Sequence, residues 1–519
     1  MVYKNQVIPR LTKKNKFISI AVAVALSVAY LIREMILKPP RNLRHIPYIG
    51  YFSVIKSMIA NESKWNRAYR VHLAEIDKPN HKGLLLEPGP LGWEVLVSNP
   101  EDAKRILLKQ DLFSKTEMSH CLDETLLGKF ALLPNIVSLN GHAWKSQRKV
   151  ANPAFHRSMP IKLFGNLTRD LFHVMETMDD TVDVTDLMER WTLDAIGKAG
   201  FGFDFNALID KDNDWVNRYN SINIGMRDPK FFVFPKLDGE YKWMFSKRAK
   251  LHKELDLFKE MLAGVIEHKK MVIKNKILTG ALQEDEKDLL TLMIESSEEG
   301  NGILTDKELM NNLCLFFIAG HDTTSNALSS AIHYLAENQD IQKKARDEAT
   351  SILGDSPFDV LPNAEDIKRM TYINQVIKES LRINPPAVQV VPRVAGEDTE
   401  LSGTFIPKGT LVTVSIFNLH HSAKAWNNPD KFDPERFSDK GENYRGPGEG
   451  FSWAPFGNGA RQCIGLNFSL NEQRVLLSML LRKFTWSTPD NSLHKNGLIN
   501  TGHIVVGPLE LDIKFCKRY

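Results

Sequence analysis

Apolar and polar positions follow a helical period over most of the chain, and the exceptions gather towards its two ends. Uncharged apolar residues run without a break over residues 17–32, and strand patterns cover residues 82–98, 403–416 and 504–513. Between them, helical patterns dominate from residue 100 to about residue 383. Central helices with strands drawn from both ends predict an α+β fold that is mostly helical, with the strands in one minor sheet.

The uncharged run at residues 17–32 predicts a membrane anchor. Its 16 residues fall just short of the roughly 17–25 that span a bilayer, but residues 33–37 and snorkelling bases extend it. No small-residue cleavage site follows, so a retained transmembrane helix over about residues 17–37 is favoured over a cleaved signal peptide. A buried soluble helix is disfavoured, because an element that is apolar all round has nothing obvious to pack against here.

Prolines mark the boundary between this anchor segment, residues 1–37, and the rest of the chain. Residues 38–50 contain three prolines and predict a stiff, basic hinge, since proline fixes φ and breaks helices. No Gly/Ser linker, low-complexity block or internal repeat divides residues 51–519. This stretch therefore predicts a single domain that carries all the candidate chemistry, although length alone would suit about three or four domains.

Charge and cysteine content narrow the classes of function. The chain has 67 Lys and Arg against 63 Asp and Glu, a net charge of +4, and charges of both signs are interleaved. That is an ordinary solvated surface, so no nucleic-acid partner is expected. The four cysteines (Cys121, Cys314, Cys463 and Cys516) show no paired spacing, which predicts reduced thiols in a cytosol-facing protein.

The residues Phe456–Gly465 (FGNGARQCIG) carry the strongest chemical signal. Glycines around Cys463 let the backbone curl closely around a planar ligand. A helix that begins at Ile464 points its N–H groups at the sulfur and is expected to favour the thiolate. A thiolate is an axial haem ligand that favours O–O cleavage. A structural buried cysteine would suit an isolated Cys-x-Gly, but not this ten-residue pattern.

A second signal lies in the middle of a long predicted helix. Thr305 and Glu308 form a capping box that opens a helix reaching about residue 337. At its centre, Ala319–Thr324 (AGHDTT) places a glycine, an acid and two hydroxyls where a core helix would be apolar. These choices fit a flat ligand and dioxygen lying against this turn; a polar kink without a catalytic role is the alternative. His321 is expected to be a satisfied surface or interhelical side chain.

Together these motifs resemble those of the cytochrome P450 family. Phe456–Gly465 matches the haem-binding signature Phe-x-x-Gly-x-Arg-x-Cys-x-Gly at every fixed position. Glu379 and Arg382 match the family's Glu-x-x-Arg pair, and Pro434–Phe437 matches its later Pro-Glu-Arg-Phe segment. The resemblance implies the cytochrome P450 fold, with a long central helix over the haem. It assigns the last two motifs to holding the fold around the cysteine loop.

The resemblance also implies a set of site residues. Cys463 is the expected axial ligand of the iron of haem b, which is held non-covalently because Ala319 lacks the carboxylate that esterifies haem in some relatives. Asp322 is expected to feed a proton relay in which Thr323 holds the reduced dioxygen. The other expected cofactor-binding residues are Phe456 and Arg461 beside the cysteine, Trp144 and Arg148 of a Trp-x-x-x-Arg motif, Arg393, and His120 as a further propionate donor. For any one arginine, an ordinary surface charge is the alternative.

The implied activity is that of a haem-thiolate monooxygenase that inserts one atom of O2 into a lipophilic small molecule. The implied partners are an NADPH-cytochrome P450 reductase, because no flavin or nicotinamide motif appears here, cytochrome b5 as an additional donor, and membrane lipid. The expected location is the ER membrane, with a single-pass anchor and the catalytic domain in the cytosol; a mitochondrial membrane is the competing location.

Four apolar segments, carried over loosely from the family, are expected to line the substrate pocket. They are residues 113–137, 315–318, 387–391 and 502–506. Long-chain lipid, sterol, aromatic metabolite and xenobiotic all fit such a pocket.

Two rival functions are open to a haem-thiolate protein. An isomerase or dehydratase would rearrange a hydroperoxide without a reductase, and a non-catalytic haem-binding protein would carry or sense haem. Neither needs the relay of Asp322 and Thr323, so these two residues favour the monooxygenase.

Overall fold

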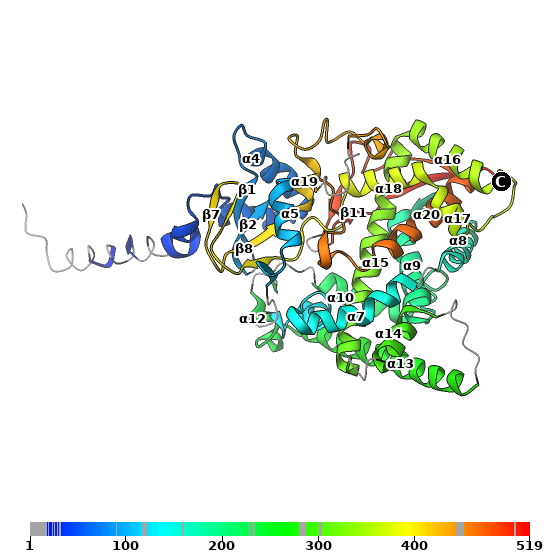
Figure 1. Ribbon diagram of the computed structural model, residues 1–519, viewed down its shortest axis with the longest axis horizontal. Helices are drawn as coiled ribbons and strands as arrows, with labels where there is room; N and C mark the ends of the chain where they lie inside the picture. Colours follow the sequence, from blue (N-terminus) through cyan, green and yellow to red (C-terminus); the bar gives the residue numbers. More distant parts are fainter. Residues whose placement is uncertain are drawn as a thin grey trace, which may run out of the picture.

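The fold is mostly helical, with one group of strands at one end of the molecule and the C-terminus at the other (Figure 1). The computed structural model describes residues 33–89, 91–116, 122–157, 160–226, 228, 230–231, 234–279, 287–299, 304–442, 451–502 and 505–519, and scattered positions between 18 and 30. The main helices are α5 (Pro100–Leu108), α7 (Gly141–Arg157), α8 (Ile161–Met175), α9 (Val184–Ala195), α10 (Asp214–Met226), α13 (Ser246–Thr279), α14 (Leu289–Glu299), α15 (Asp306–Glu337), α16 (Gln339–Leu353), α17 (Ala364–Arg369), α18 (Thr371–Ile383) and α20 (Leu466–Lys483). The α+β prediction is confirmed.

The predicted anchor over about residues 17–37 falls largely on positions outside the described residues. Searched over the part of the chain that the structure describes, no helix combines the length and the apolar character needed to cross a membrane. Residues Arg33–Leu37 form a short π-helix, η1. Glu34 of this turn accepts a hydrogen bond from Arg44 at 2.8 Å, which ties η1 to the proline-rich segment that follows.

The proline-rich segment at residues 38–50 packs onto the domain behind it. Leu43 and Ile46 are buried with the side chains of the neighbouring sheet. The N–H of Ile49 donates to the carbonyl of Leu86 at 2.8 Å, and the N–H of Leu86 donates to the carbonyl of Pro47 at 2.8 Å. The segment thus extends the edge of the sheet, and the packed part of the chain reaches back to Leu43.

The described strands form four sheets, where the sequence predicted one. The hairpin of β1 (Leu84–Gly89) and β2 (Gly92–Val97) is confirmed, with Leu84 opposite Val97. The strand expected over residues 504–513 is displaced, because β12 covers Asp512–Lys517. The five-stranded sheet has the order β1-β2-β8 (Leu411–Val414)-β5 (Arg393–Ala395)-β3 (Phe113–Lys115), the three-stranded sheet has the order β4 (Thr181–Asp183)-β12-β9 (Phe484–Ser487), and two pairs join β6 (Thr399–Leu401) to β7 (Thr404–Ile406) and β10 (Asn500–Thr501) to β11 (Gly507–Pro508).

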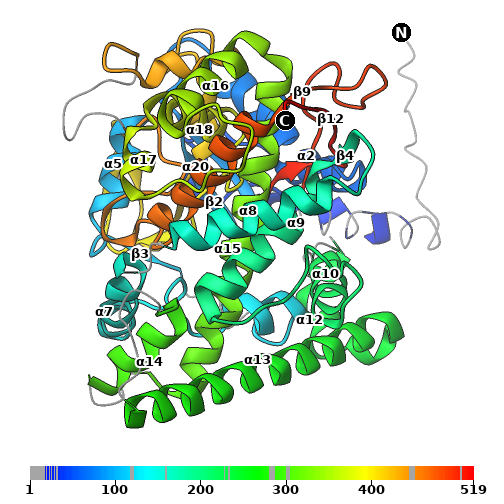
Figure 2. The same cartoon turned by 90° about the vertical axis from the view of Figure 1, so that its right-hand side faces the viewer.

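Helix α15 crosses the middle of the helical part, as predicted (Figure 2). Its capping box is formed as expected, since Thr305 caps the N–H of Glu308 and the Glu308 side chain accepts from the N–H of Thr305 at 2.9 Å. The helix packs on α9, α18 and α20, and most of its residues are buried in the main apolar core. A helix held on several sides in this way gives a rigid platform for any functional group at its centre.

Candidate functional site

Cys463 follows a tight loop that two glycines make possible. Gly457 and Gly459 have φ values of +64° and +70°, a region that L side chains rarely adopt. A Cβ on Gly459 would also lie 2.8 Å from the carbonyl oxygen of Leu107, because the loop packs on the end of α5. The N–H of Cys463 closes the loop by donating to the carbonyl of Phe456 at 2.9 Å. The tight turn and, at Gly459, the packing on α5 therefore require glycine, and the close approach to a planar ligand stays a prediction.

The Cys463 side chain has exposed surface, although many protein atoms surround its thiol. Burial raises the pKa of the thiol, and the N–H of Gly465 and the charge of Arg148 only partly oppose this. The helix after the cysteine begins at Leu466, not at Ile464. The predicted helix start at Ile464 is wrong by two residues, and burial of the thiol acts against the thiolate that the prediction favoured. A bound metal ion would take the thiolate and displace its proton.

Four cations converge beside this loop: Lys115 on β3, Arg148 on α7, Arg393 on β5, and Arg461 just before the cysteine. Burial, together with the charges of Arg461, Arg393 and Arg148, lowers the pKa of Lys115 to about 7. Burial likewise lowers the pKa values of Arg393 and Arg461 to about 10. Within the described residues, no acidic side chain forms an ion pair with any of the four. An uncompensated, half-buried positive cluster of this kind fits a dianionic ligand.

Each of the three arginines also has a buried N–H group without an acceptor. The groups are Nε of Arg148, Nε of Arg393 and Nη1 of Arg461. Buried donors are normally satisfied, so their convergence indicates a missing acceptor. Protein groups hold the remaining donors in place: Arg148 donates to the carbonyl of Gln462 (3.0 Å), Arg393 to that of Ile106 (2.8 Å), and Arg461 to Oδ1 of Asn140 (3.1 Å). The two propionates of the expected haem have the charge and the acceptors that these groups lack.

Trp144 was predicted to belong to this cluster, whereas Lys115 was not. Trp144 is buried, and the guanidinium of Arg461 lies 3.8 Å from the centroid of its ring, so the tryptophan orients the arginine by a cation–π contact. Lys115 was missed because it belongs to no motif. The antiparallel pairing of β3 and β5 places it opposite Arg393, a like-charge pair that is unfavourable without an anion. His120 lies outside the described residues.

The central turn of α15 carries an accessible face in an otherwise buried helix. Ala319 is exposed, and Gly320 and Thr323 are half-buried. The hydroxyl of Thr323 donates to the carbonyl of Ala319 at 2.6 Å. Gly320 has a reason other than the expected ligand, since its Cβ would lie 2.9 Å from the side chain of Ile196, which packs against this turn. The accessible face is therefore formed by Ala319 and Thr323.

Asp322 is held by helix α10, a contact that the sequence did not reveal. The hydroxyl of Tyr219 donates to Oδ1 of Asp322 at 2.6 Å, and Nδ2 of Asn223 donates to Oδ2 at 3.2 Å. Tyr219 and Asn223 are four residues apart and so share one face of α10. His321 is an interhelical side chain, as expected, with Nδ1 2.9 Å from the hydroxyl of Thr192. No hydrogen bond in the described structure joins the side chains of Asp322 and Thr323, so they are neighbours on one turn that face different partners.

An apolar cavity of about 300 Å³ reaches Asp322 on α15. All four segments expected to line a pocket contribute to its wall, through residues such as Leu127, Ile318, Val390 and Val505. The structure thus brings together segments separated by almost four hundred positions in the chain.

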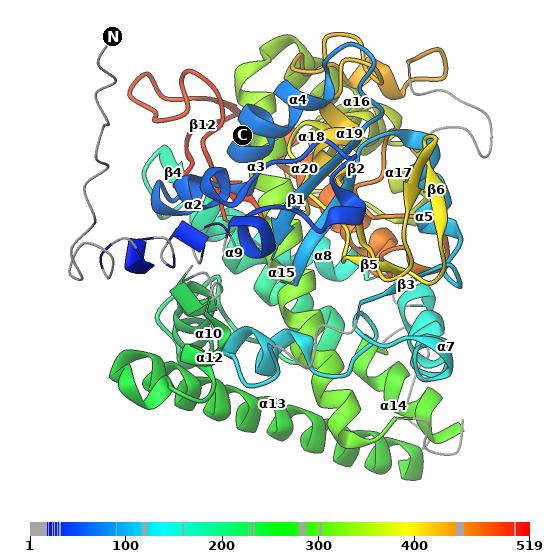
Figure 3. The same ribbon diagram turned by 90° about the vertical axis from the view of Figure 1, so that its left-hand side faces the viewer.

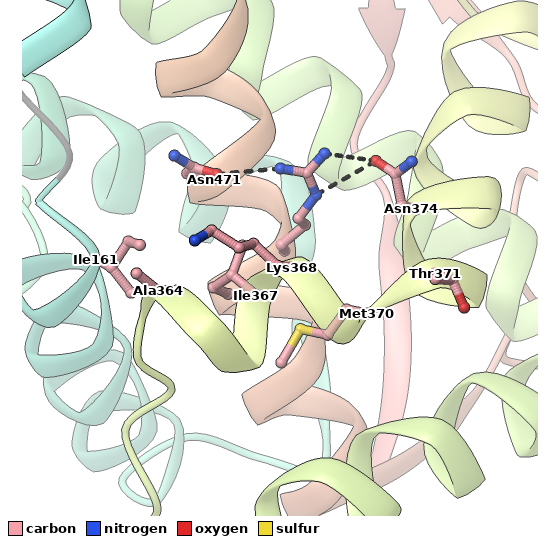
Figure 4. A pocket seen from close by; sticks show the side chains of 9 residues that line it. Ile161, Ala364, Ile367, Lys368, Met370, Thr371, Asn374 and Asn471 are labelled. Atoms are coloured by element: carbon pink, nitrogen blue, oxygen red, sulfur yellow. Dashed lines mark hydrogen bonds between the residues drawn. The ribbon is translucent and has the colours of Figure 1, made fainter.

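A second cavity of about 420 Å³ lies between α8, α17 and α20 and is lined by no predicted site residue (Figure 4). Arg474 crosses it and donates to Oδ1 of Asn374 at 2.7 Å and to Oδ1 of Asn471 at 3.1 Å. These groups satisfy one another, and the cavity has no acid–base pair, so it offers little chemistry.

The Glu-x-x-Arg pair on α18 is fully buried and connected to the cysteine loop. Glu379 and Arg382 form two hydrogen bonds of 2.8 and 2.9 Å, and Arg436 reaches Glu379 at 3.3 Å. Arg382 donates to the carbonyl of His420 at 2.8 Å. The N–H of Ala454, two residues before the loop, donates to Nε2 of His420 at 3.0 Å, so the ring proton of His420 is on Nδ1. The predicted structural network is present, and His420 joins it to the loop.

Glu472 on α20 is a buried carboxyl group that the sequence did not single out. It has no exposed surface, and neither carboxyl oxygen has a hydrogen-bond partner. Burial raises the pKa of Glu472 well above the ordinary carboxyl value, and Thr324 on α15 only partly opposes this. The hydroxyl of Thr324 is within 3.0 Å of the hydroxyl of Ser469 instead. Burial therefore favours the neutral form of the Glu472 carboxyl group.

Replacing Glu472 by methionine should stabilise the protein increasingly as the pH rises. Because the folded-state pKa is raised, wild type loses stability above the unfolded pKa, by at most about 1.4 kcal/mol per pH unit, until the folded pKa is reached. Glu472→Met removes that loss. Urea unfolding at about pH 5 and pH 8 measures the difference. Glu365→Met, at a highly exposed carboxylate, is the matched control, and equal pH dependence of Glu472→Met and wild type would contradict the prediction.

Comparison with known proteins gives one consistent family. The cytochrome P450 family model matches residues 93–515, a range that contains every predicted site residue. Cytochrome P450 3A12 of Canis lupus familiaris is 28% identical over 409 residues, which cover 75% of this chain and 76% of that protein. Cytochrome P450 4A10 of Rattus norvegicus is 29% identical over 402 residues, 75% of each chain. Protein LUTEIN DEFICIENT 5, chloroplastic, of Arabidopsis thaliana is 28% identical over 433 residues, 81% of this chain and 70% of that protein.

Proposed function

The chain belongs to the cytochrome P450 family, and we propose that it is a membrane-anchored monooxygenase that oxidises a lipophilic small molecule. Membership of the family carries haem-thiolate chemistry, in which bound haem supplies an iron that activates O2. We assign Cys463 to the iron. We assign the four-cation cluster of Lys115, Arg148, Arg393 and Arg461 to the propionates of a non-covalently bound haem b, with Trp144 and Phe456 supporting Arg461 and the loop.

The observation that carries the proposal is the place of Asp322 and Thr323. Asp322 lines the apolar cavity, and Thr323 belongs to the accessible face of the same helical turn. A substrate C–H bond in that cavity and a proton-delivering group would therefore be close together. A haem carrier has no use for this arrangement, and an isomerase that acts on a hydroperoxide needs no external protons for O–O cleavage.

In the proposed relay, each of the two side chains has a separate task. Thr323 donates its own proton to the carbonyl of Ala319, which leaves the oxygen of its hydroxyl free to accept a hydrogen bond from a protonated group in the site. Asp322 exchanges protons beside it, and Tyr219 and Asn223 are positioning residues that hold the carboxylate. Because no bond joins Asp322 to Thr323, proton transfer between them requires a water molecule or a change of rotamer.

The proposed electron source is NADPH, through an NADPH-cytochrome P450 reductase, with cytochrome b5 as an additional donor. The proposed location is the ER membrane, with the domain in the cytosol and the anchor over about residues 17–37. The uncharged run at residues 17–32 supports the anchor. Membrane fractionation of the whole chain and of a variant without residues 1–37 tests it, and an unchanged membrane fraction would refute it.

Thr323→Ala is expected to uncouple oxygen consumption from product formation. The substitution removes a half-buried hydroxyl and a methyl group, so haem binding and substrate binding should change little. Without the acceptor oxygen, electrons from NADPH should appear increasingly as hydrogen peroxide. Product per NADPH should fall by about a hundredfold, the lower end of the range for general acid–base contributions. The measurement is product and peroxide per NADPH, with reductase present.

Two control variants separate the relay from packing. Thr323→Ser keeps the hydroxyl and should retain most of the coupling. Thr324→Ala removes the neighbouring hydroxyl, which faces Ser469 on α20, and should leave coupling unchanged. If Thr323→Ala forms as much product per NADPH as wild type, Thr323 has no role in a proton relay. If wild type turns over a hydroperoxide but never couples NADPH oxidation to product, the protein is an isomerase or dehydratase and not a monooxygenase.

A further inference from the structure

One wall of the apolar cavity is made by two stretches of chain that meet at a single contact. Residues 122–132 contribute four apolar side chains to the lining, and the end of α10 contributes Met226. The Leu126 side chain packs on Gly225 of α10, where a Cβ would lie only 3.2 Å from it. Behind this wall lie the short helix α12 (Pro235–Asp238) and the long helix α13, which packs on α10 (Figure 3).

The carboxylate of Asp238 is bonded to both stretches of the wall. Its Oδ2 accepts from the N–H of Leu126 at 2.9 Å, across 112 positions of the chain. Both of its oxygens also accept from the guanidinium of Arg248 on α13, and Nη1 of Arg248 donates to the carbonyl of Gly225. The last carbonyls of a helix lack intrahelical partners, so Arg248 caps α10 while it holds the carboxylate. Asp238 thus binds one stretch directly and the other through Arg248.

The cluster around Asp238 is buried and its charges are balanced. The side chains of Asp238 and Arg248 are 2% and 4% exposed. His252 on α13 donates from Nε2 to Oδ1 of Asp238 at 2.8 Å. Burial alone would raise the pKa of Asp238, but hydrogen bonds from Arg248, His252 and the N–H of Leu126 lower it to about 2. Charge-assisted, two-pronged hydrogen bonds of this kind fix geometry, so the cluster fixes the position of the two stretches relative to each other.

We propose that Asp238 is a positioning residue that sets the shape of the substrate cavity by holding residues 122–132 against the end of α10. Leu126 lies between residues of that stretch that line the cavity, so its release would let the lining side chains move with it. A wall that is held in one place discriminates between ligands by size and shape, because close packing leaves little room for adjustment. This inference rests on the proposed function, which makes the cavity the substrate site.

The test is a spectral titration of the haem-loaded full chain with imidazole and with 4-phenylimidazole. Both ligands would bind the iron through a ring nitrogen, but only the phenyl group would contact the cavity wall. The double variant Asp238→Leu/Arg248→Met removes both bonds to the wall without leaving a buried charge unpaired. It should bind imidazole as wild type does. Its preference for 4-phenylimidazole should fall about tenfold, which corresponds to the loss of about two buried CH2 groups.

Two control variants separate the position of the wall from general stability. His252→Gln keeps a donor to the carboxylate, and because His252 bonds only to Asp238, the wild-type preference should remain. Asp288→Asn breaks another ion pair of α13, that of Asp288 with Lys269 at 2.7 Å, and neither residue lines the cavity. It should leave the preference unchanged. A double variant with the wild-type preference would overturn the inference, and so would an equal fall in Asp288→Asn.

A second measurement needs no variant, so it decides the inference even if the double variant does not fold. In wild type, 4-phenylimidazole should slow amide hydrogen exchange at Leu126, because a filled cavity holds the wall closed. The amide of Thr291, which donates to Asp288 at 2.9 Å, should exchange at an unchanged rate. Unchanged exchange at Leu126 would overturn the inference.

The proposed function is tested separately, by the carbon monoxide spectrum and by the product formed per NADPH. A protein that passes those tests and shows no effect of Asp238 on ligand preference is a monooxygenase whose cavity is shaped by other contacts.

Discussion

Cys463→His abolishes the red-shifted Soret band that reduced wild-type protein is expected to show with carbon monoxide. The band would report a thiolate bound to the haem iron, and imidazole cannot supply the same electron density. The substitution should also remove reductase-supported turnover completely. The accessible thiol at the end of the Phe456–Gly465 loop is the basis of the prediction, because the loop holds the sulfur in place through the N–H of Cys463.

The control is Cys516→His, which changes an exposed cysteine on β12. This variant should keep the band and the activity of wild type. Since Cys463→His can still bind haem through imidazole, the total haem content is measured alongside the spectrum by a pyridine extract. A thiolate band that persists in Cys463→His would end the assignment of the axial ligand.

Glu379→Gln is expected to destabilise the protein by about 3–5 kcal/mol, because it leaves a buried guanidinium without its counter-charge. Arg382 and Glu379 have no exposed side-chain surface, and Arg436 is also drawn to this carboxylate. The variant is nearly isosteric, so the loss reports charge and not volume. Because the network continues through His420 to Ala454, haem incorporation should fall together with the midpoint of urea unfolding.

A matched ion pair at the surface provides the control. Lys368 and Glu365 have the same spacing of three residues on α17 and a distance of 2.7 Å, but their side chains are 70% and 77% exposed. Glu365→Gln should cost less than about 1 kcal/mol. If Glu379→Gln unfolds at the same urea concentration as Glu365→Gln and takes up haem normally, the buried network does not hold the loop. If Glu379→Gln cannot be obtained as folded protein, that result agrees with the expected loss of stability.

Helix positions were predictable where the local signal is strong. The capping box of Thr305 and Glu308 is local in sequence, and it predicted the start of α15 correctly. The helix has 32 residues and ends at Glu337, where its end was predicted. The start of α20 was predicted two residues early, since Ile464 and Gly465 continue the apolar pattern without taking part in the helix. Strands were predicted less well: β12 extends beyond the expected range because its pairing with β4 and β9 sets its ends.

The sequence by itself determined the family and the Glu379–Arg382 pair, and it predicted the cysteine ligand and the Asp322–Thr323 relay, because each motif consists of residues a few positions apart. Only the tertiary structure decided that Lys115 faces Arg393, that Tyr219 holds Asp322, and that Asp238 holds Leu126. The physical reason is that these contacts join residues from about a hundred to about three hundred positions apart, whose proximity depends on strand register and helix packing. The pKa of the Cys463 thiol was also decided only by the tertiary structure, because burial of the thiol is a property of the folded chain.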